Sequence, residues 1–271
     1  KKCLNKKGMA LVQVEAYLGR KKKYFSTKVY LKPEQWDNKK LIVKNHPNAD
    51  ALNRLIYEFV ATIEKKELEL YIHIPFCVRK CNYCDFLSFP ADEDTQRQYV
   101  KALCKEIFYY GAHCRDYVVS TVYIGGGTPS WLWESDMAEI MDAVHKNFAL
   151  LPDAEISVEC NPGTVTAQKF AVYRQSGINR ISLGLQSAQN VELKMLGRIH
   201  TWEQFLKTYE LARAGGFSNI NVDLMSSLPG QHTATYADSL QKVCRLKPEH
   251  ISAYSLIIEK GTPFYDLYKF D

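Results

Sequence analysis

The hydrophobic and polar positions of the chain follow two different rhythms, and the change between them falls near residue 67. In the first segment, imperfect alternation predicts two strands joined by a turn, and apolar residues at helical spacing predict one helix. The expected elements are strands at 9–18, 23–31 and 41–43, and a helix from Asn48 to about Glu69. The first segment is therefore expected to be a small α+β domain, a three-stranded sheet plus one helix.

From Leu68 onward, short apolar runs alternate with amphipathic stretches. The expected strands span 68–74, 119–124, 155–159, 180–185, 220–224 and 250–256. The expected helices between them span 93–113, 134–148, 166–176, 189–197, 202–215 and 234–245. This repeat predicts an α/β fold with parallel strands, either a partial (β/α) barrel or an open sheet. In both arrangements functional residues are expected at the C-terminal ends of the strands.

Charge divides the chain at the same place, although the net charge of the whole chain is only +5. Residues 1–66 contain 16 Lys and Arg against 6 Asp and Glu, a net charge of +10, whereas residues 67–271 contain 19 against 24, a net charge of −5. We therefore predict two domains, 1–66 and 67–271, of which the first suits a polyanionic partner. The apolar runs are too short to cross a bilayer and no signal pattern opens the chain, so a cytoplasmic protein is expected.

Three of the eight cysteines lie in one short loop, directly after the first expected strand of the second domain. Cys77, Cys81 and Cys84 have the spacing C-x3-C-x2-C. Three thiolates on one loop can hold three irons of a 4Fe–4S cluster, which leaves the fourth iron open to chelate a small molecule. The alternatives are a zinc site completed by His73, or three buried structural cysteines. The position at the end of a strand favours the cluster.

Glycines and polar residues follow the other expected strands. The segment Gly125–Pro129 would let the backbone approach a ligand closely, with a tight turn as the alternative interpretation. Glu159, Gln186 and Asp223 place carboxylates and an amide at the same edge, although a solvated Glu159 is an alternative. Arg198 can pair with a carboxylate as a bidentate fork. Together these residues predict a polar ligand beside the cysteines.

With Tyr71-Ile-His-Ile-Pro-Phe-Cys77 before the loop and Tyr83 inside it, residues 67–271 resemble the radical S-adenosylmethionine superfamily. Within it they resemble the oxygen-independent coproporphyrinogen III oxidases and, most, the haem chaperones of the HemW type. The resemblance implies a partial (β/α)6 TIM-like barrel, a 4Fe–4S cluster on the three cysteines, and S-adenosylmethionine as cofactor. The cofactor contacts that it implies are Tyr71, Gly126, Gly127, Thr128, Glu159, Gln186, Arg198 and Asp223.

The resemblance also implies a reaction, the reductive cleavage of S-adenosylmethionine with an electron from a flavodoxin- or ferredoxin-type donor. Phe86 stands where the oxidases usually carry a further cysteine, and their longer N-terminal segment is missing. The leading interpretation is therefore a haem-binding chaperone, and an oxidase acting on coproporphyrinogen in porphyrin biosynthesis is the alternative. Enzyme activity is left open, because family members continue with a C-terminal domain that we expect this chain to lack.

Residues 4–66 resemble an unrelated family, the arm-type DNA-binding domain of Bacteroides-type phage integrases. The resemblance rests on Phe25–Leu31, on Lys32–Asp37 and on the helix from Asn48. It implies a DNA partner, and a charged hairpin could supply the phosphate contacts, with a merely solvated face as the alternative. The expected contacts are Arg20, Lys21, Lys22, Lys23 and Lys28. The two resemblances meet at 65–70, which we interpret as the junction of a fusion.

Overall fold

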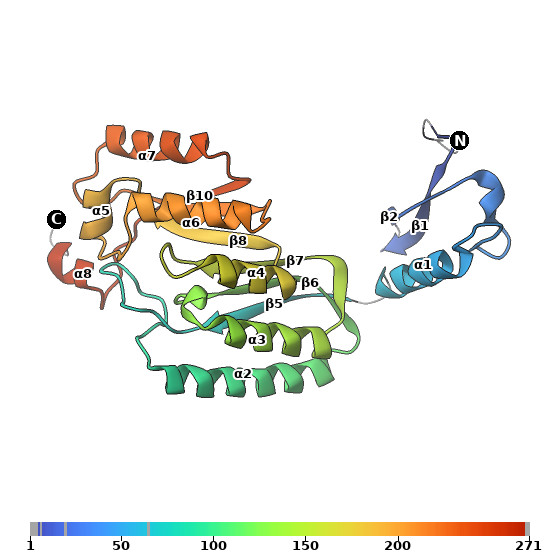
Figure 1. Ribbon diagram of the computed structural model, residues 1–271, viewed down its shortest axis with the longest axis horizontal. Coiled ribbons are helices and arrows are strands. Elements are labelled where there is room, and N and C mark those ends of the chain that lie inside the picture. Colours follow the sequence, from blue (N-terminus) through green and yellow to red (C-terminus); the bar gives the residue numbers. More distant parts are fainter. Residues whose placement is uncertain (1–4, 6, 19–20, 64–65, 269–271) are drawn as a thin grey trace. The chain divides into compact units, whose positions relative to one another are not determined.

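The structure, a computed structural model, describes residues 5, 7–18, 21–63 and 66–268. The chain forms two compact units, Lys1–Lys66 and Glu67–Asp271 (Figure 1). Each unit has its own hydrophobic core and is described by itself.

The first unit contains two small sheets and one helix. Strands β1 (Ala10–Leu18) and β2 (Lys21–Leu31) form an antiparallel hairpin, and α1 (Ala49–Ile63) is the helix. Its buried core consists of Val29, Leu31, Val43 and Ile56.

The prediction of a three-stranded sheet was wrong. The third strand, β4 (Ile42–Val43), pairs with β3 (Trp36–Asp37) and not with the hairpin. One physical reason is that Asn53 of α1 holds both backbone groups of Val43, accepting from its N–H at 2.6 Å and donating to its carbonyl at 3.0 Å. These groups are then not available to a further strand.

The predicted end of the first helix was also wrong, because α1 ends at Ile63 and β5 (Lys66–Ile74) begins soon after it. Residues 67–70 alternate between exposed and half-buried positions, and Leu68 and Leu70 pack on the core of the second unit. This period of two is the pattern of a strand with one buried face. Packing in the second unit therefore decides that this segment forms a strand, although its sequence also allowed a helix.

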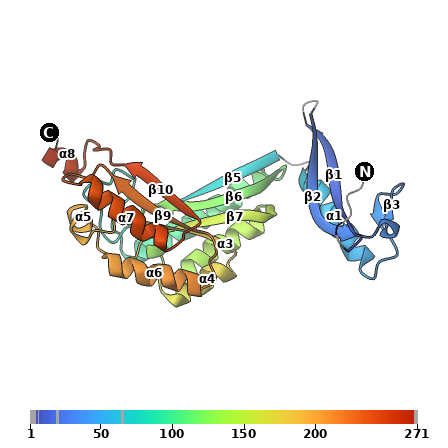
Figure 2. The ribbon, with the colours of Figure 1, turned by 90° about the horizontal axis from the view of Figure 1, so that it is seen from above.

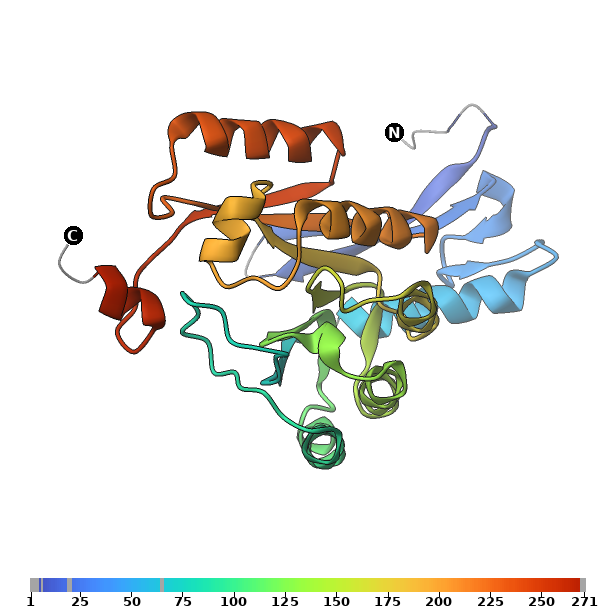
Figure 3. The same ribbon diagram turned by 60° about the vertical axis from the view of Figure 1, so that its left-hand side comes forward.

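The second unit is built on one six-stranded sheet. In spatial order its strands are β5, β6 (Tyr117–Gly126), β7 (Leu150–Cys160), β8 (Arg180–Gln186), β9 (Ile220–Ser226) and β10 (His250–Ser255). The pairs from β6 to β10 are parallel. The sheet is curled, as Figure 3 shows, so the predicted partial (β/α)6 TIM-like barrel is confirmed.

Helices connect the strands and cover the sheet (Figure 2). They are α2 (Glu93–His113), α3 (Glu134–Asn147), α4 (Ala167–Gln175), α5 (Asn190–Met195), α6 (Trp202–Ala214), α7 (Thr233–Arg245) and α8 (Pro263–Tyr268). Side-chain caps fix several of their starts: Asp92, Thr166 and Thr201 each accept from a backbone N–H of the first turn. Among the described residues, no helix combines the length and the apolar character that crossing a bilayer requires.

The main core lies between the sheet and these helices. In β8 every residue after Arg180 is buried, as expected for a central strand of a parallel sheet. Phe170 of α4 and Phe205 of α6 are fully buried against the strands. This rigid packing fixes the strand ends from which the functional side chains project.

Candidate cofactor site

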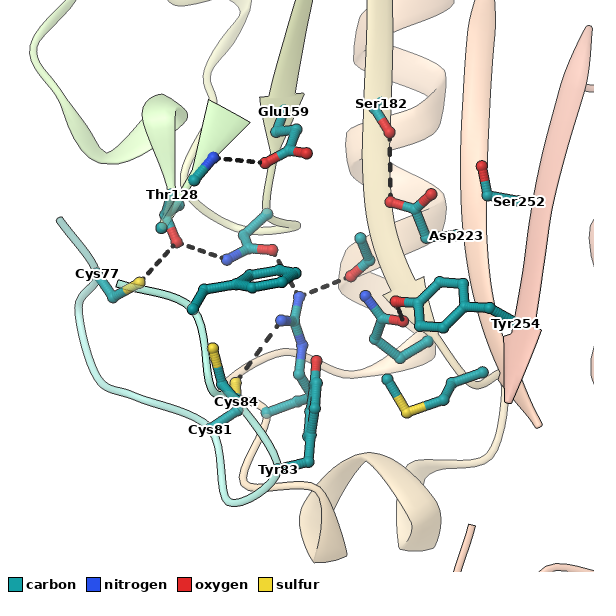
Figure 4. Close-up of a pocket in the computed structure, with 18 of the residues that line it drawn as sticks. Cys77, Cys81, Tyr83, Cys84, Thr128, Glu159, Ser182, Asp223, Ser252 and Tyr254 are labelled. Atoms are coloured by element: carbon teal, nitrogen blue, oxygen red, sulfur yellow. Dashed lines mark hydrogen bonds between the residues drawn. The ribbon is translucent and has the colours of Figure 1, made fainter. Parts of the chain in front are cut away.

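A cavity of about 640 Å³ opens at the C-terminal ends of the six strands (Figure 4). The loop after β5 supplies the cysteines, and residues from the ends of β6 to β10 complete the wall. Ten of the residues predicted from the sequence line it together: Cys77, Cys81, Cys84, Gly126, Gly127, Thr128, Glu159, Gln186, Arg198 and Asp223. The structure therefore brings these residues together at the strand ends, where the sequence predicts functional residues.

The cysteine loop is anchored by Asn82, which lies between two of the cysteines. Its backbone N–H donates to the Leu196 carbonyl at 3.0 Å, and its side-chain amide donates to the Met195 carbonyl at 2.8 Å. Its own carbonyl accepts from the N–H of Phe264 in α8 at 3.0 Å. The loop is thus tied to two other segments of the rim.

Two glycines let the backbone after β6 approach the cysteine loop. A Cβ on Gly127 would come within 2.8 Å of the Phe76 carbonyl and 3.1 Å of Cys77 Sγ. Gly126 has a φ of +116°, and a Cβ there would lie 2.6 Å from the ring of His73. Only glycine fits these positions without displacing the cysteine loop at Gly127 and the His73 ring of β5 at Gly126.

Two half-buried carboxylates face the cavity, Glu159 from β7 and Asp223 from β9, and β8 lies between these two strands. Glu159 accepts hydrogen bonds from the Tyr123 hydroxyl at 2.8 Å and from the Gly126 N–H at 3.1 Å. Asp223 accepts from the Asn221 amide at 2.7 Å and from the Ser182 hydroxyl at 3.3 Å. Burial raises the pKa of both carboxyl groups above their ordinary values.

Gln186 ends β8 in a strained conformation. Its φ is +73°, a left-handed value that is uncommon for a residue other than glycine, and the β8–β9 register shifts between Leu183 and Gln186. Its side-chain oxygen accepts from the Tyr254 hydroxyl at 2.7 Å, and burial raises the pKa of Tyr254 to about 12. Strain of this kind clusters at ligand sites, where it aims a side chain into the cavity.

Arg198 is the buried cation of the site. One terminal nitrogen, Nη2, donates to Asn161 Oδ1 and to the Gly184 carbonyl, both at 2.6 Å. The other, Nη1, lies 3.7 Å from Cys81 Sγ. Its Nε is buried without a hydrogen-bond partner among the described residues. The guanidinium is thus a fixed positive charge at the cavity wall, which suits an anionic group of a ligand, such as a carboxylate.

Tyr71 does not line the cavity. Its side chain is 60% exposed, its ring stacks on Tyr123, and its hydroxyl lies 3.0 Å from His73 Nδ1. His73 Nε2 lies 2.9 Å from the Leu87 carbonyl, so both ring nitrogens already have partners, which disfavours a zinc site completed by this histidine. Within the described ranges, no three His, Cys, Asp or Glu side chains are placed to hold one metal ion.

The residues expected to contact DNA are described only in part. Arg20 lies outside the described residues. Lys21, Lys22 and Lys23 begin β2, and the structure describes their backbone alone. Lys28 lies in the same strand with an exposed side chain and a φ of +59°. Four of the five residues, all of them lysines, therefore belong to one strand.

Four further residues belong to the site or support it without having been predicted from the sequence: Asn82, Tyr123, Asn161 and Tyr254. Each binds a predicted residue or anchors its loop, through bonds between segments far apart in the chain. The available signal was position alone, since Asn161 directly follows β7 and Tyr254 lies near the end of β10.

Comparison with known families supports this geometry. Residues 71–243 match the model of the radical SAM superfamily. The chain belongs to the radical SAM superfamily. This family works with a 4Fe–4S cluster and S-adenosylmethionine, and the three thiols of the cysteine loop and the guanidinium of Arg198 in one cavity fit these groups. Residues 1–74 match a different model, an arm DNA-binding domain.

Individual relatives agree with the family match. The haem chaperone HemW of Escherichia coli (strain K12) is 42% identical over 198 residues, which are 73% of this chain and 52% of that protein. HemW of Bacillus subtilis (strain 168) is 38% identical over 200 residues, with 73% and 52% covered. The solved structure of coproporphyrinogen III oxidase HemN from Escherichia coli superposes with a TM-score of 0.67 at 30% identity, covering 75% of this chain and 47% of that one. The chain thus spans about half the length of these relatives.

Proposed function

We propose that Cys77, Cys81 and Cys84 hold a 4Fe–4S cluster and that the cavity beside them binds S-adenosylmethionine. The observation that carries this proposal is the meeting of three cysteines from one loop with the guanidinium of Arg198 in one cavity. When bound, the cluster supplies the electron for reductive cleavage of the sulfonium. A reduced flavodoxin- or ferredoxin-type protein is the proposed electron donor.

The chain's own residues would orient the cofactor. The guanidinium of Arg198 would pair with the carboxylate of its methionine part. The backbone at Gly126 and Gly127 and the Thr128 hydroxyl would contact the amino group. Glu159 and Asp223 would accept from the ribose hydroxyls. Gln186 lines the same wall, and Tyr71 would have to turn from His73 toward the cavity to make contact.

A quantitative iron assay tests the cluster. We expect about four irons per chain after anaerobic reconstitution, with brown absorption that is lost in Cys77→Ser, Cys81→Ser and Cys84→Ser. Cys244→Ser is the matched control, because that exposed thiol lies on α7, away from the cavity. Bound zinc without iron, and no release of methionine under reducing conditions, would overturn the proposal.

For the biological role, we propose a haem chaperone of the HemW type. The similarity to HemW proteins supports it, and so do exposed apolar side chains at the cavity wall that suit a flat macrocycle: Phe86 is 68% exposed and Ile257 is 69% exposed. Coproporphyrinogen oxidation is the second candidate, on the likeness to HemN.

Haem titration separates these two roles. A chaperone should develop a Soret band at one haem per chain and pass haem to an acceptor protein. The double variant Phe86→Ser, Ile257→Ser should weaken haem binding while iron content stays unchanged. Decarboxylation of coproporphyrinogen without haem binding would reverse the ranking.

We also propose that residues 1–66 bind DNA. The match of residues 1–74 to an arm DNA-binding domain supports this, together with the net charge of +10 on residues 1–66. The phage-integrase type of that domain is likewise a proposal, resting on the motifs at Phe25–Leu31 and Lys32–Asp37.

A further inference from the structure

One side-chain amide joins two hydrogen-bond donors that point at cysteine sulfurs (Figure 4). The Nδ2 of Asn161 donates to Thr128 Oγ1 at 2.8 Å, and its Oδ1 accepts from Arg198 Nη2 at 2.6 Å. The Thr128 hydroxyl lies 3.4 Å from Cys77 Sγ, and Arg198 Nη1 lies 3.7 Å from Cys81 Sγ. A single network therefore runs from one cysteine through Asn161 to another.

The chemistry of the groups fixes the direction of each bond. A guanidinium can only donate, so the oxygen of the Asn161 amide must face Arg198 and its nitrogen must face Thr128. The amide nitrogen in turn can only donate, so the Thr128 hydroxyl accepts from it. The hydroxyl proton is then directed to Cys77 Sγ.

Asn161 is itself held in place. Its backbone N–H donates to the Ser130 hydroxyl at 3.1 Å, and its carbonyl accepts from the Thr164 hydroxyl at 2.8 Å. These two hydroxyls also bond to each other, at 2.5 Å. These bonds fix the backbone of Asn161, and the bonds to Thr128 and Arg198 fix the orientation of its side-chain amide.

We propose that Asn161 is a positioning residue that raises the reduction potential of the cluster by aiming these two donors at Cys77 and Cys81. This inference rests on the proposed cluster site. One-electron reduction makes a thiolate-bound cluster more negative, and hydrogen bonds to its sulfur ligands, or a nearby positive charge, stabilise the reduced form more than the oxidised one. By fixing the Thr128 hydroxyl beside Cys77 and the Arg198 guanidinium beside Cys81, the Asn161 amide acts on two ligands of the cluster.

The sharpest test is Asn161→Asp, which keeps the size of the side chain. A carboxylate accepts from both neighbours, so the Thr128 hydroxyl turns to residue 161 and leaves Cys77, while a negative charge is added beside the cluster. We expect the ratio of reduced to oxidised cluster at a fixed ambient potential to fall at least tenfold, which is a shift of about 59 mV for one electron. The measurement is a dithionite titration of the reconstituted full chain, followed by electron paramagnetic resonance.

Two further variants keep the test sharp. Thr128→Val removes the donor to Cys77, and with it the acceptor for Asn161 Nδ2, but adds no charge, so it should lower the potential by less. Asn179→Asp is the matched control, because Asn179 also bonds backbone groups, of Ile156 and Ala154, but precedes β8 at the end of the strand opposite the cavity. Its cluster should keep the wild-type potential.

The outcomes separate the two proposals. About four irons per chain with an unchanged potential in Asn161→Asp would overturn this inference and leave the cluster proposal standing. If Asn161→Asp assembles no cluster, an unchanged potential in Thr128→Val overturns the inference by itself. A wild-type chain that binds no iron would overturn both.

Discussion

His200 is a buried histidine whose ring stays uncharged in the folded chain. It follows Arg198 by two residues and is 4% exposed. Its Nε2 donates to the Leu185 carbonyl at 3.3 Å, while Nδ1 is buried without a partner among the described residues. Burial, and then the neighbouring charge of Arg198, lowers its pKa from 6.5 to about 3. The neutral ring is thus part of the packing behind the cavity.

This burial makes stability depend on pH in a definite direction. Below pH 6.5 the unfolded chain binds a proton at His200 that the folded chain refuses, so the free energy of unfolding falls as the pH drops from 6.5 toward 3. Between pH 6.5 and pH 5 the loss is about 2 kcal/mol. Urea unfolding at the two pH values measures it, and His200→Gln should lose correspondingly less. His113→Gln, at the exposed end of α2, is the control and should behave as wild type. Equal losses in all three proteins would contradict the prediction.

At the scale of elements, the alternation of apolar runs with amphipathic stretches predicted most of the strands and helices of the second unit. The range 93–113 predicted for the first long helix is the range of α2, because Asp92 caps its start. The pattern gave wrong predictions where contacts with other segments decide the structure. Asn53 holds strand β4. The residues expected to end the first helix form the start of β5 instead, because Leu68 packs on the core of the second unit.

The candidate site shows the same difference between residues that a local pattern predicts and residues whose role depends on distant contacts. Residues that belong to compact motifs after strands, such as Cys77 and Gly127, were predictable because the motif and the strand end are both local. Asn161 and Asn82 were not, because their role is set by partners more than 30 residues away in the chain. A single sequence contains no signal for such pairings.

The start of α6 offers a test of local stabilisation. The Thr201 hydroxyl accepts from the Gln204 N–H at 3.3 Å, and the Gln204 side chain accepts from the Thr201 N–H at 2.9 Å, which is a capping box. Thr201→Ala should lower the free energy of unfolding by about 1 kcal/mol. Thr201→Ser keeps the hydroxyl and should lose far less. Urea midpoints measure both, and equal loss in the two variants would show that the methyl group and not the cap matters.

At the scale of the whole molecule, two units of opposite charge share one chain. The family matches overlap only at residues 71–74, within β5. Residues 1–66 have a net charge of +10 and residues 67–271 a net charge of −5. Because a polyanion is attracted by positive and repelled by negative net charge, the DNA binding proposed for residues 1–66 should depend on the first unit alone.

Salt dependence tests this separation on the full chain. Each phosphate contact contributes about 0.9 to the slope of log affinity against log salt, so Lys21→Glu, Lys22→Glu and Lys23→Glu together should reduce the slope by about 2 to 3. The matched control reverses three exposed lysines of the second unit, Lys101, Lys105 and Lys207. Both triple variants change the net charge equally, so a difference between them reports location. Fluorescence anisotropy with duplex DNA over a salt series measures the slopes, and the control should keep the wild-type slope. Equal weakening by both variants would mean that net charge, and not the hairpin, governs the attraction.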